Sequence, residues 1–176
     1  MQVSEHNNGI RPWDPIVDLP RLVEVTTAAD ALFAEHGLAL PPDNPTNELL
    51  DADHVLVANA PHPVGFAFLN KLDGHAHLGG LAVHPDYGRR GIGTALLRRS
   101  RVWAEEQGYR AITLTTFADV PWNRPLYEHL GFRVLAPAEV GPELAAVRDE
   151  EAATGLDPST RVCMRHDIVA GSRQAR

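Results

Sequence analysis

Short runs of apolar, often β-branched residues recur along the chain and are separated by turn-forming residues. Such runs favour extended backbone, and an Asp-Gly pair between two of them is a strong hairpin signal. Asp73-Gly74 occupies that place here. The pattern predicts seven strands: Ile10–Trp13, His54–Asn59, Val64–Leu72, His75–Val83, Ala111–Thr116, Phe132–Leu135 and Arg161–Ile168.

Longer stretches with apolar residues three and four positions apart predict helices between these strands. Asp18 is placed to cap a first helix that reaches about Phe33, and Gly37 and Gly108 are typical of residues that follow a helix end. The other expected helical segments are Thr46–Leu50, 91–107, Pro121–Leu130 and Glu139–Ala153.

A hairpin early in the chain and a crossover helix later indicate an α/β fold with a mixed sheet. No linker is long enough to divide the chain. We therefore expect a flexible N-terminus at residues 1–9, a single domain over residues 10–170 and a flexible tail at residues 171–176.

Composition narrows the classes of protein. Of 176 residues, 44% are apolar and 22% charged, as in ordinary globular proteins. No apolar run is long enough to span a membrane, and the N-terminus lacks the basic start and apolar core of a signal peptide. A net charge of −7 argues against broad nucleic-acid binding. The single cysteine, Cys163, excludes an intrachain disulfide and favours a cytoplasmic location.

The most informative segment is Gly88–Thr94, where an apolar strand enters a turn that opens into a helix. Backbone N–H groups at a helix start have no partner inside the helix, and with the helix dipole they attract phosphate. The three glycines allow close approach of the backbone to an anion, and Arg89 and Arg90 add positive charge. The segment therefore predicts a site for a phosphorylated ligand.

Two familiar phosphate motifs fit this segment poorly. A P-loop needs a lysine after its glycines, but the only lysine is Lys71. The dinucleotide fingerprint needs a third glycine where Leu96 stands. Residues 84–110 carry six arginines against three acids, which suits a small polyanion such as coenzyme A as well as it suits a solvated helix face.

A third motif fits better. Gly88-Arg89-Arg90-Gly91-Ile92-Gly93 resembles the pyrophosphate loop of the GCN5-related N-acetyltransferases (the GNAT superfamily), written Gln/Arg-x-x-Gly-x-Gly/Ala, with Gly88 in place of Gln or Arg. The segment Asn123–Phe132 resembles the later family motif Asn-x-x-Ala-x-x-x-Tyr-x-x-x-Gly-Phe, with local variation in spacing. Together the two motifs cover roughly residues 78–134.

The resemblance implies a mixed, mostly antiparallel central sheet with a splayed strand pair, flanked by helices. It also implies an acyl-CoA-dependent N-acyltransferase that transfers acetyl from acetyl-CoA to a primary amine by direct attack in a ternary complex, without a metal. Two other functions stay open at this point: a non-catalytic acetyl-CoA sensor and a nucleotide-binding structural domain.

The same resemblance assigns residues to the donor. It gives the backbone of Leu81, Ala82 and Val83 to the pantetheine arm and the thioester carbonyl. Tyr127 matches the general acid that protonates the coenzyme A sulfur, although a core aromatic is the alternative. Asn123 matches a contact to the cofactor arm, or else caps the following helix. The expected contacts to the diphosphate are Gly88, Arg89, Arg90, Gly91, Ile92, Gly93 and Thr94.

The general base is harder to place. Many relatives carry a glutamate on the strand before the loop, but His75–Val83 contains no acid. His77 matches the first of two histidines that the arylalkylamine N-acetyltransferases carry there, while Gly79 occupies the second position. A histidine titrates near neutrality and relays protons. His77 is therefore the tentative base, against a half-exposed structural histidine, a water chain, or one of Glu35, His36 and Asp119.

The acceptor pocket is expected after the first helix and after the strand ending at Thr116, with Phe33, His36, Phe117 and Trp122 as its lining. The acceptor is expected to be a small-molecule amine or a peptide or protein amine. Net acidity favours a cationic acceptor through electrostatic steering. The resemblance leaves a homodimer open.

Overall fold

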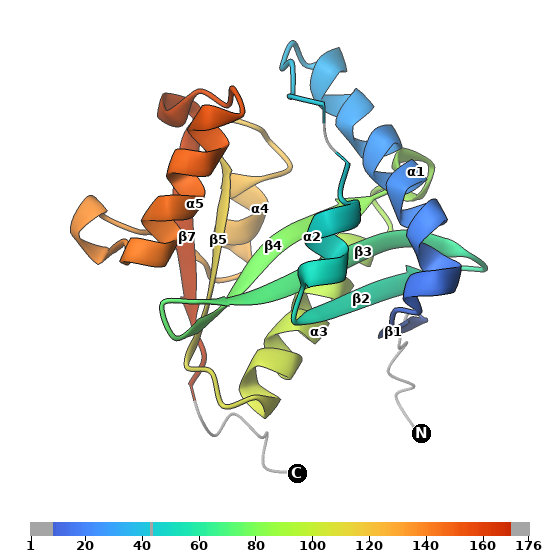
Figure 1. The fold of residues 1–176 in the computed structure, drawn as a ribbon, viewed down its shortest axis with the longest axis horizontal. Helices are drawn as coiled ribbons and strands as arrows, with labels where there is room; N and C mark the ends of the chain where they lie inside the picture. Colours follow the sequence, from blue (N-terminus) through green and yellow to red (C-terminus); the bar gives the residue numbers. More distant parts are fainter. Residues whose placement is uncertain (1–8, 43, 170–176) are drawn as a thin grey trace. The chain divides into compact units, whose positions relative to one another are not determined.

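The structure is a computed structural model that describes residues 9–42 and 44–169. Its seven strands in this part of the chain hydrogen-bond in the order β1-β2-β3-β4-β5-β7-β6, and helices flank the sheet (Figure 1). The strands are β1 (Ile10–Pro12), β2 (His54–Asn59), β3 (Pro63–Leu72), β4 (His75–Val83), β5 (Ala111–Phe117), β6 (Arg133–Val134) and β7 (Arg161–Asp167). All seven expected strands are therefore present, with ends that shift by a residue or two.

Strand pairing is antiparallel except between β4 and β5. This parallel ladder joins only Ala76–Leu78 to Ile112–Leu114, whereas β4 continues to Val83 and β5 to Phe117. The mixed, mostly antiparallel sheet is thus confirmed, and the short ladder agrees with the splayed strand pair that the family resemblance implies.

Five α-helices lie in the described residues: α1 (Pro15–Glu35), α2 (Thr46–Asp51), α3 (Ile92–Glu106), α4 (Arg124–His129) and α5 (Pro142–Ala153). Short 3₁₀ turns, η1 to η3, occupy Pro85–Tyr87, Pro137–Glu139 and Pro158–Thr160. None of the helices in this part of the chain is both long enough and apolar enough to cross a membrane.

The predicted cap of the first helix was wrong. Asp14 caps α1, because its side chain accepts from the N–H of Ile16 and of Val17 and is followed by Pro15, a favoured first helical residue. Asp18 instead lies buried in the first turn. There both of its carboxylate oxygens accept from the Arg11 guanidinium at 2.8 Å.

The last helix also begins later than expected. Pro137–Glu139 forms a separate 3₁₀ turn, and α5 starts at Pro142 because proline fits the first helical position but not a helix interior. The carboxylate of Asp73 caps α5 by accepting from the N–H of Glu143 and of Leu144, each at 3.0 Å. Similarly, α4 begins at Arg124 rather than at Pro121.

The chain divides into two compact units. The first unit runs up to Leu69 and includes Gly80–Ser100; the second unit comprises Asn70–Gly79 and the chain from Arg101 onward. A core made by α1, α2, β2 and β3 holds the first unit together: Leu22, Val25, Leu49, Val55, Val57, Phe66 and Phe68. In the second unit Leu135, Leu144 and Cys163 pack together against Leu72 and Val140.

The expectation of a single domain over residues 10–170 stays a prediction. Apart from Gly9, the expected flexible ends lie outside the described residues.

Candidate active site

The predicted anion site lies in the first unit, between β4 and α3. We call residues Gly88–Thr94 the anion loop. Its residues 88–91 are exposed, and Arg89 and Gly91 adopt left-handed backbone with φ of 59° and 75°. The first backbone bond of α3 runs from the Ala95 N–H to the Gly91 carbonyl at 2.9 Å. The N–H groups of the preceding residues, 92–94, therefore have no acceptor inside the helix.

Residues just before the anion loop fix where it starts. The His84 N–H donates to the Val64 carbonyl on β3 at 2.8 Å. The His84 ring accepts from the Asp86 N–H at 3.2 Å and so caps η1. The 3₁₀ turn closes when the Gly88 N–H donates to the Pro85 carbonyl at 3.0 Å. The loop is thereby anchored at its first residue.

The two loop arginines differ in their surroundings. The Arg90 guanidinium lies 5.3 Å from the ring centre of Tyr87 and donates to the Asp86 carbonyl at 3.4 Å. Both arginines are exposed. Arg90 is thus held at the start of the loop, whereas the left-handed backbone of Arg89 turns the chain toward α3.

The protein's own structure calls for a glycine at position 91 but not at position 93. Gly91 has a positive φ that side-chain-bearing residues rarely adopt. Gly93 does not: a Cβ there would meet Leu81 at 3.6 Å and Val83 at 3.8 Å, which are ordinary contacts. A larger residue at position 93 would therefore not clash with its neighbours in the first unit, so packing does not explain the glycine there. Thr94, which follows it in α3, is half-buried.

The end of β4 packs closely on β3 within the first unit. Leu81, Ala82 and Val83 are half-buried there. A Cβ at Gly65 of β3 would lie 3.0 Å from the Ala82 carbonyl oxygen, and one at Gly80 would lie 2.4 Å from the Phe68 ring. The glycines thus allow β3 to approach the segment that the resemblance assigns to the pantetheine arm.

Tyr127 stands on α4 in the second unit. Its ring meets Phe132 edge-on at 5.8 Å, and its carbonyl accepts from the Phe132 N–H at 2.9 Å. Burial raises the pKa of the phenol to about 12, although the positive charge of Arg161 acts in the opposite direction. In the part of the chain that the structure describes, the hydroxyl has no hydrogen-bond partner.

Asn123 occupies the N-cap position of α4, but its side chain makes no capping bond. Its carbonyl accepts from the Tyr127 N–H at 3.1 Å. The alternative role of Asn123, a side-chain cap, is therefore not realised in this structure.

His77 is only 4% exposed, so the expectation of a half-exposed histidine was wrong. Its Nδ1 lies 2.9 Å from the Thr113 hydroxyl on β5, within the second unit. Burial lowers the pKa of the ring to about 4, so the ring is neutral at pH 7. Whether His77 acts as a base stays a prediction.

A family model described as the acetyltransferase (GNAT) family matches residues 23–132, which is more than half of the 176-residue chain. The chain belongs to the GNAT acetyltransferase family. The resemblance seen in the two motifs is thereby confirmed.

Solved structures of GNAT proteins share the fold. PaiA N-acetyltransferase from Thermoplasma acidophilum, in complex with coenzyme A, is 18% identical with a TM-score of 0.68, over 90% of this chain and 98% of that one. The ribosomal-protein-S18-alanine N-acetyltransferase from Escherichia coli is 22% identical with a TM-score of 0.65, over 95% and 97%. A GNAT acetyltransferase from Elizabethkingia anophelis, with acetyl-CoA bound, is 16% identical with a TM-score of 0.65, over 93% and 100%.

The four residues expected to line the acceptor pocket of this GNAT protein are divided between the units. Phe33 is half-buried in the last turn of α1, and the ring of the exposed His36 lies 2.9 Å from the Leu32 carbonyl. Phe117 is buried at the end of β5, and Trp122 is half-buried in the turn before α4. That these four residues form one pocket stays a prediction.

The sequence did not predict a charged group beside Phe117, which we call the arginine cluster: Thr115, Arg148, Glu151 and Arg161. The Arg161 guanidinium lies 4.5 Å from the Phe117 ring centre. The three-residue spacing of Arg148 and Glu151 on a predicted helix was a readable signal for one pair. The contribution of Arg161, from a strand ten residues later, carried no such signal.

No group of three or more His, Cys, Asp or Glu side chains among the described residues is arranged to hold a metal ion.

Proposed function

We propose that this GNAT protein transfers acetyl from acetyl-CoA to a primary amine by direct attack in a ternary complex. The observation that carries the proposal is the anion loop, with its two left-handed residues and the first-turn amides of α3, which have no acceptor inside the helix. Such amides, reinforced by the helix dipole, bind phosphate oxygens. Coenzyme A presents a diphosphate of suitable charge.

The donor contacts follow the family motif. Backbone N–H groups of residues 89–94 hold the diphosphate, with added charge from Arg89 and Arg90, because the Gly88 N–H is already bonded to the Pro85 carbonyl. A Cβ at Gly91 would have no neighbour within 4 Å, and this open space supports close approach of the ligand to the helix start. Backbone of Leu81–Val83 takes the pantetheine arm and thioester carbonyl, and Asn123 contacts the arm. Coenzyme A and acetyl-CoA in the fold neighbours support this choice of donor.

The reaction forms one bond and breaks one bond. The neutral amine nitrogen attacks the thioester carbonyl carbon, and the carbon–sulfur bond of the tetrahedral intermediate then breaks. We assign Tyr127 as the general acid that gives its proton to the leaving thiolate. A phenol with a pKa of about 12 stays protonated at neutral pH, which an acid requires. The amine proton leaves to a base or to water.

We assign His77, on β4, as the base. A neutral ring accepts a proton, but its 4% exposure requires that water carry the proton from the amine. Replacing His77 with glutamine separates this role from a structural one: a base role predicts a lower kcat, whereas a structural role predicts lost stability with an unchanged kcat.

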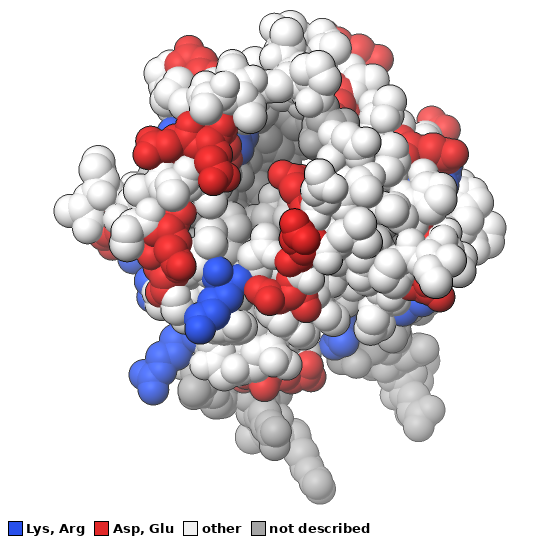
Figure 2. Space-filling model, in the orientation of Figure 1, with Lys and Arg blue, Asp and Glu red and all other residues white. Residues whose placement is uncertain are grey.

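The acceptor is an amine of a small molecule, a peptide or a protein. Figure 2 shows Asp and Glu side chains spread over the visible face, in line with the net charge of −7. Such a surface attracts cationic acceptors and repels anionic ones. One fold neighbour is, by its name, an enzyme for a ribosomal-protein alanine, so a peptide amine belongs in any test.

The test measures free thiol released from acetyl-CoA across a panel of polyamines, amino acids, peptides with a free N-terminus and lysine peptides. We expect turnover with at least one class of amine. Acetyl-CoA binding, measured by calorimetry, without turnover on any amine would favour a sensor. Stabilisation by ATP or NAD in preference to coenzyme A would overturn the assignment of the donor. The cytoplasmic location stays a prediction.

A further inference from the structure

The second unit contains a cavity of about 430 Å³ that the proposed transfer reaction does not use. It lies beside β6, η2, α5 and β7, within the connection that joins the last two strands. A cavity of this size accommodates a small organic molecule. Its lining residues are Val134, Leu135, Pro137, Val140, Ala145, Arg148, Asp149, Arg161, Val162 and Cys163.

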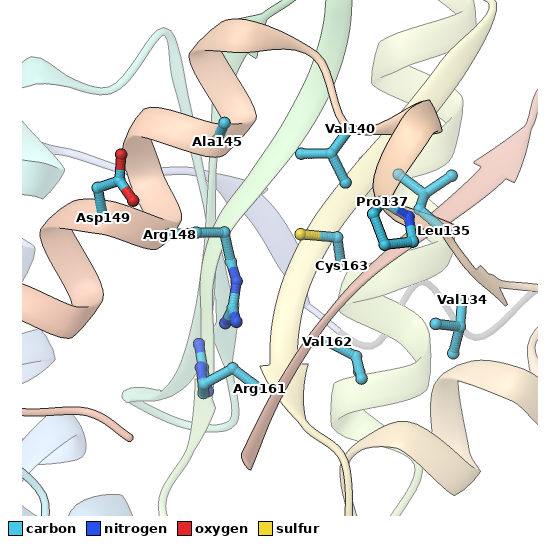
Figure 3. A pocket seen from close by; sticks show the side chains of 10 residues that line it. All are labelled: Val134, Leu135, Pro137, Val140, Ala145, Arg148, Asp149, Arg161, Val162 and Cys163. Atoms are coloured by element: carbon cyan, nitrogen blue, oxygen red, sulfur yellow. The ribbon is translucent and has the colours of Figure 1, made fainter. Parts of the chain in front are cut away.

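Most of the cavity wall is aliphatic. Figure 3 shows Leu135, Pro137 and Val140 on one side of the cavity, with the Cys163 sulfur between them and the arginines. Leu135 is 8% exposed and Cys163 7% exposed. The apolar part of a ligand would be removed from water here and would contact aliphatic side chains, which favours binding.

The opposite side of the cavity carries the guanidinium groups of Arg148 and Arg161 (Figure 3). The two arginines share one carboxylate, because Glu151 Oε2 accepts from both at 3.2 Å. Arg161 also donates to Glu151 Oε1 at 2.8 Å, and the Thr115 hydroxyl donates to the same oxygen. The arginine side chains are 19% and 11% exposed.

Charge balance in the arginine cluster is incomplete. Burial alone would raise the pKa of Glu151, but hydrogen bonds from Arg161 and Thr115 and the charges of both arginines outweigh it, so the pKa lies below its ordinary value. Glu151 is therefore ionised at neutral pH, and two guanidiniums against one carboxylate leave one positive charge. Glu151 does not itself line the cavity, and the acid that does, Asp149, is exposed to solvent.

We propose that this cavity binds a small aliphatic monocarboxylate, whose carboxylate lies on Arg148 and Arg161 and whose hydrocarbon body lies against the aliphatic wall. A guanidinium pairs with a carboxylate through charge-assisted hydrogen bonds. A phosphate ester would leave the aliphatic wall unused, and a free amine would meet the excess positive charge. All the lining residues belong to the second unit and none is assigned to acetyl-CoA.

Cys163 provides a direct readout of occupancy, because it is the only cysteine and it lines the cavity. The experiment follows alkylation of Cys163 by iodoacetamide in the full-length protein, with 4-methylpentanoate or its uncharged amide, 4-methylpentanamide. We expect the carboxylate to slow alkylation saturably, by roughly tenfold at ten times its Kd, and the amide to have little effect. Equal protection by both compounds, or none by either, would overturn the proposal.

Variants locate the binding. Arg148→Gln should weaken protection by 4-methylpentanoate about tenfold or more, whereas Arg133→Gln should leave it unchanged. Arg133 is a matched control because it lies in the same segment and pairs with Glu139 at 2.9 Å, yet does not line the cavity. If Arg148→Gln binds the carboxylate as tightly as the parent, the cluster is not the site.

A second variant tests the cavity without touching the charges. Ala145→Phe would fill the space beside the half-buried Ala145 of α5. Calorimetric titration with 4-methylpentanoate should show binding to the parent and none to this variant, at an unchanged melting temperature. Undiminished binding by Ala145→Phe would place the ligand elsewhere. Because neither readout uses acetyl-CoA, these outcomes are independent of the transferase assignment.

Discussion

The anion loop of the first unit and the arginine cluster of the second unit both offer donors to a negative group, but they are built in opposite ways. The loop uses backbone N–H groups at an exposed helix start, and its conformation depends on Arg89 and Gly91 in left-handed backbone. The cluster uses two largely buried guanidiniums that a shared carboxylate holds in place.

This difference in construction indicates which site binds a ligand common to related proteins and which binds a ligand specific to this protein. Backbone donors suit a ligand part that does not vary, such as a diphosphate, because they keep their positions whatever side chains surround them. Side-chain donors from separate elements suit a ligand that distinguishes one protein from another, since one substitution alters the site. We therefore expect the loop to serve the common donor and the cluster to be specific to this protein.

The largest expected effect concerns Tyr127, which we propose as the general acid. Tyr127→Phe should lower kcat about a thousandfold, because general acid catalysis typically contributes 10²- to 10⁴-fold. The Kd for acetyl-CoA should change little, since we propose that the backbone of the anion loop, and not Tyr127, holds the diphosphate. Steady-state kinetics and calorimetry measure the two quantities. Tyr109→Phe, a tyrosine packed on Trp103 at 5.9 Å, is the matched control.

The pH profile of the parent sharpens this test. The acid works only while protonated, so activity should fall as pH rises through the pKa of Tyr127, which is about 12. A loss of kcat already complete at pH 10 would contradict the assignment, as would normal turnover by Tyr127→Phe.

The next effect concerns the buried His77 ring and how its protonation changes the stability of the protein with pH. Burial lowers the pKa of His77 from 6.5 to about 4 in the folded protein. The unfolded chain therefore binds the proton more readily, and this part of the stability is present above pH 6.5 and lost as pH falls toward 4. The difference corresponds to about 3 kcal/mol in the free energy of unfolding.

Urea unfolding of the parent and of His77→Gln at pH 7 and at pH 4 measures this difference. The parent should lose about 3 kcal/mol more than the variant over that interval. His129→Gln, at an exposed position of α4, should behave like the parent. Equal losses in parent and His77→Gln would show that the ring is not shielded from water.

A smaller effect distinguishes the cost of backbone strain from a loss of ligand binding. It compares the glycines at the two ends of α3. Gly91 and Gly108 have similar φ values, 75° and 80°, and a Cβ at either would have no neighbour within 4 Å. Alanine at either site should cost about 1 kcal/mol of stability through backbone strain. Only Gly91→Ala should also weaken acetyl-CoA binding, by about tenfold, or 1.4 kcal/mol.

Thermal unfolding and calorimetric titration of the two variants give both quantities. A similar loss of acetyl-CoA affinity in Gly91→Ala and Gly108→Ala would mean that general destabilisation, rather than the anion loop, controls binding.

The parts of this molecule that the sequence predicted are those encoded locally. The strands, the Asp73-Gly74 hairpin and the family motifs each depend on residues that are close together in the chain. The cap of α1 was misplaced because Asp14 and Asp18 both precede apolar residues, and only the buried pairing of Asp18 with Arg11 distinguishes them. The arginine cluster was missed because Thr115, Arg148 and Arg161 come from three separate elements.

The smallest expected effect uses salt to separate the two regions. Arg89→Gln should weaken acetyl-CoA binding about threefold at low ionic strength, and the difference should nearly vanish at about 0.5 M salt, because exposed charges are screened. The loss caused by Arg148→Gln in 4-methylpentanoate binding should persist at the same salt concentration, since that guanidinium is largely buried. Arg124→Gln, which removes an exposed pair with Glu128, should affect neither ligand. A salt-independent loss of acetyl-CoA affinity in Arg89→Gln would mean that this side chain contacts the ligand directly in a desolvated site. The anion loop would then bind through a side chain as well as through its backbone, and the contrast with the arginine cluster would not hold.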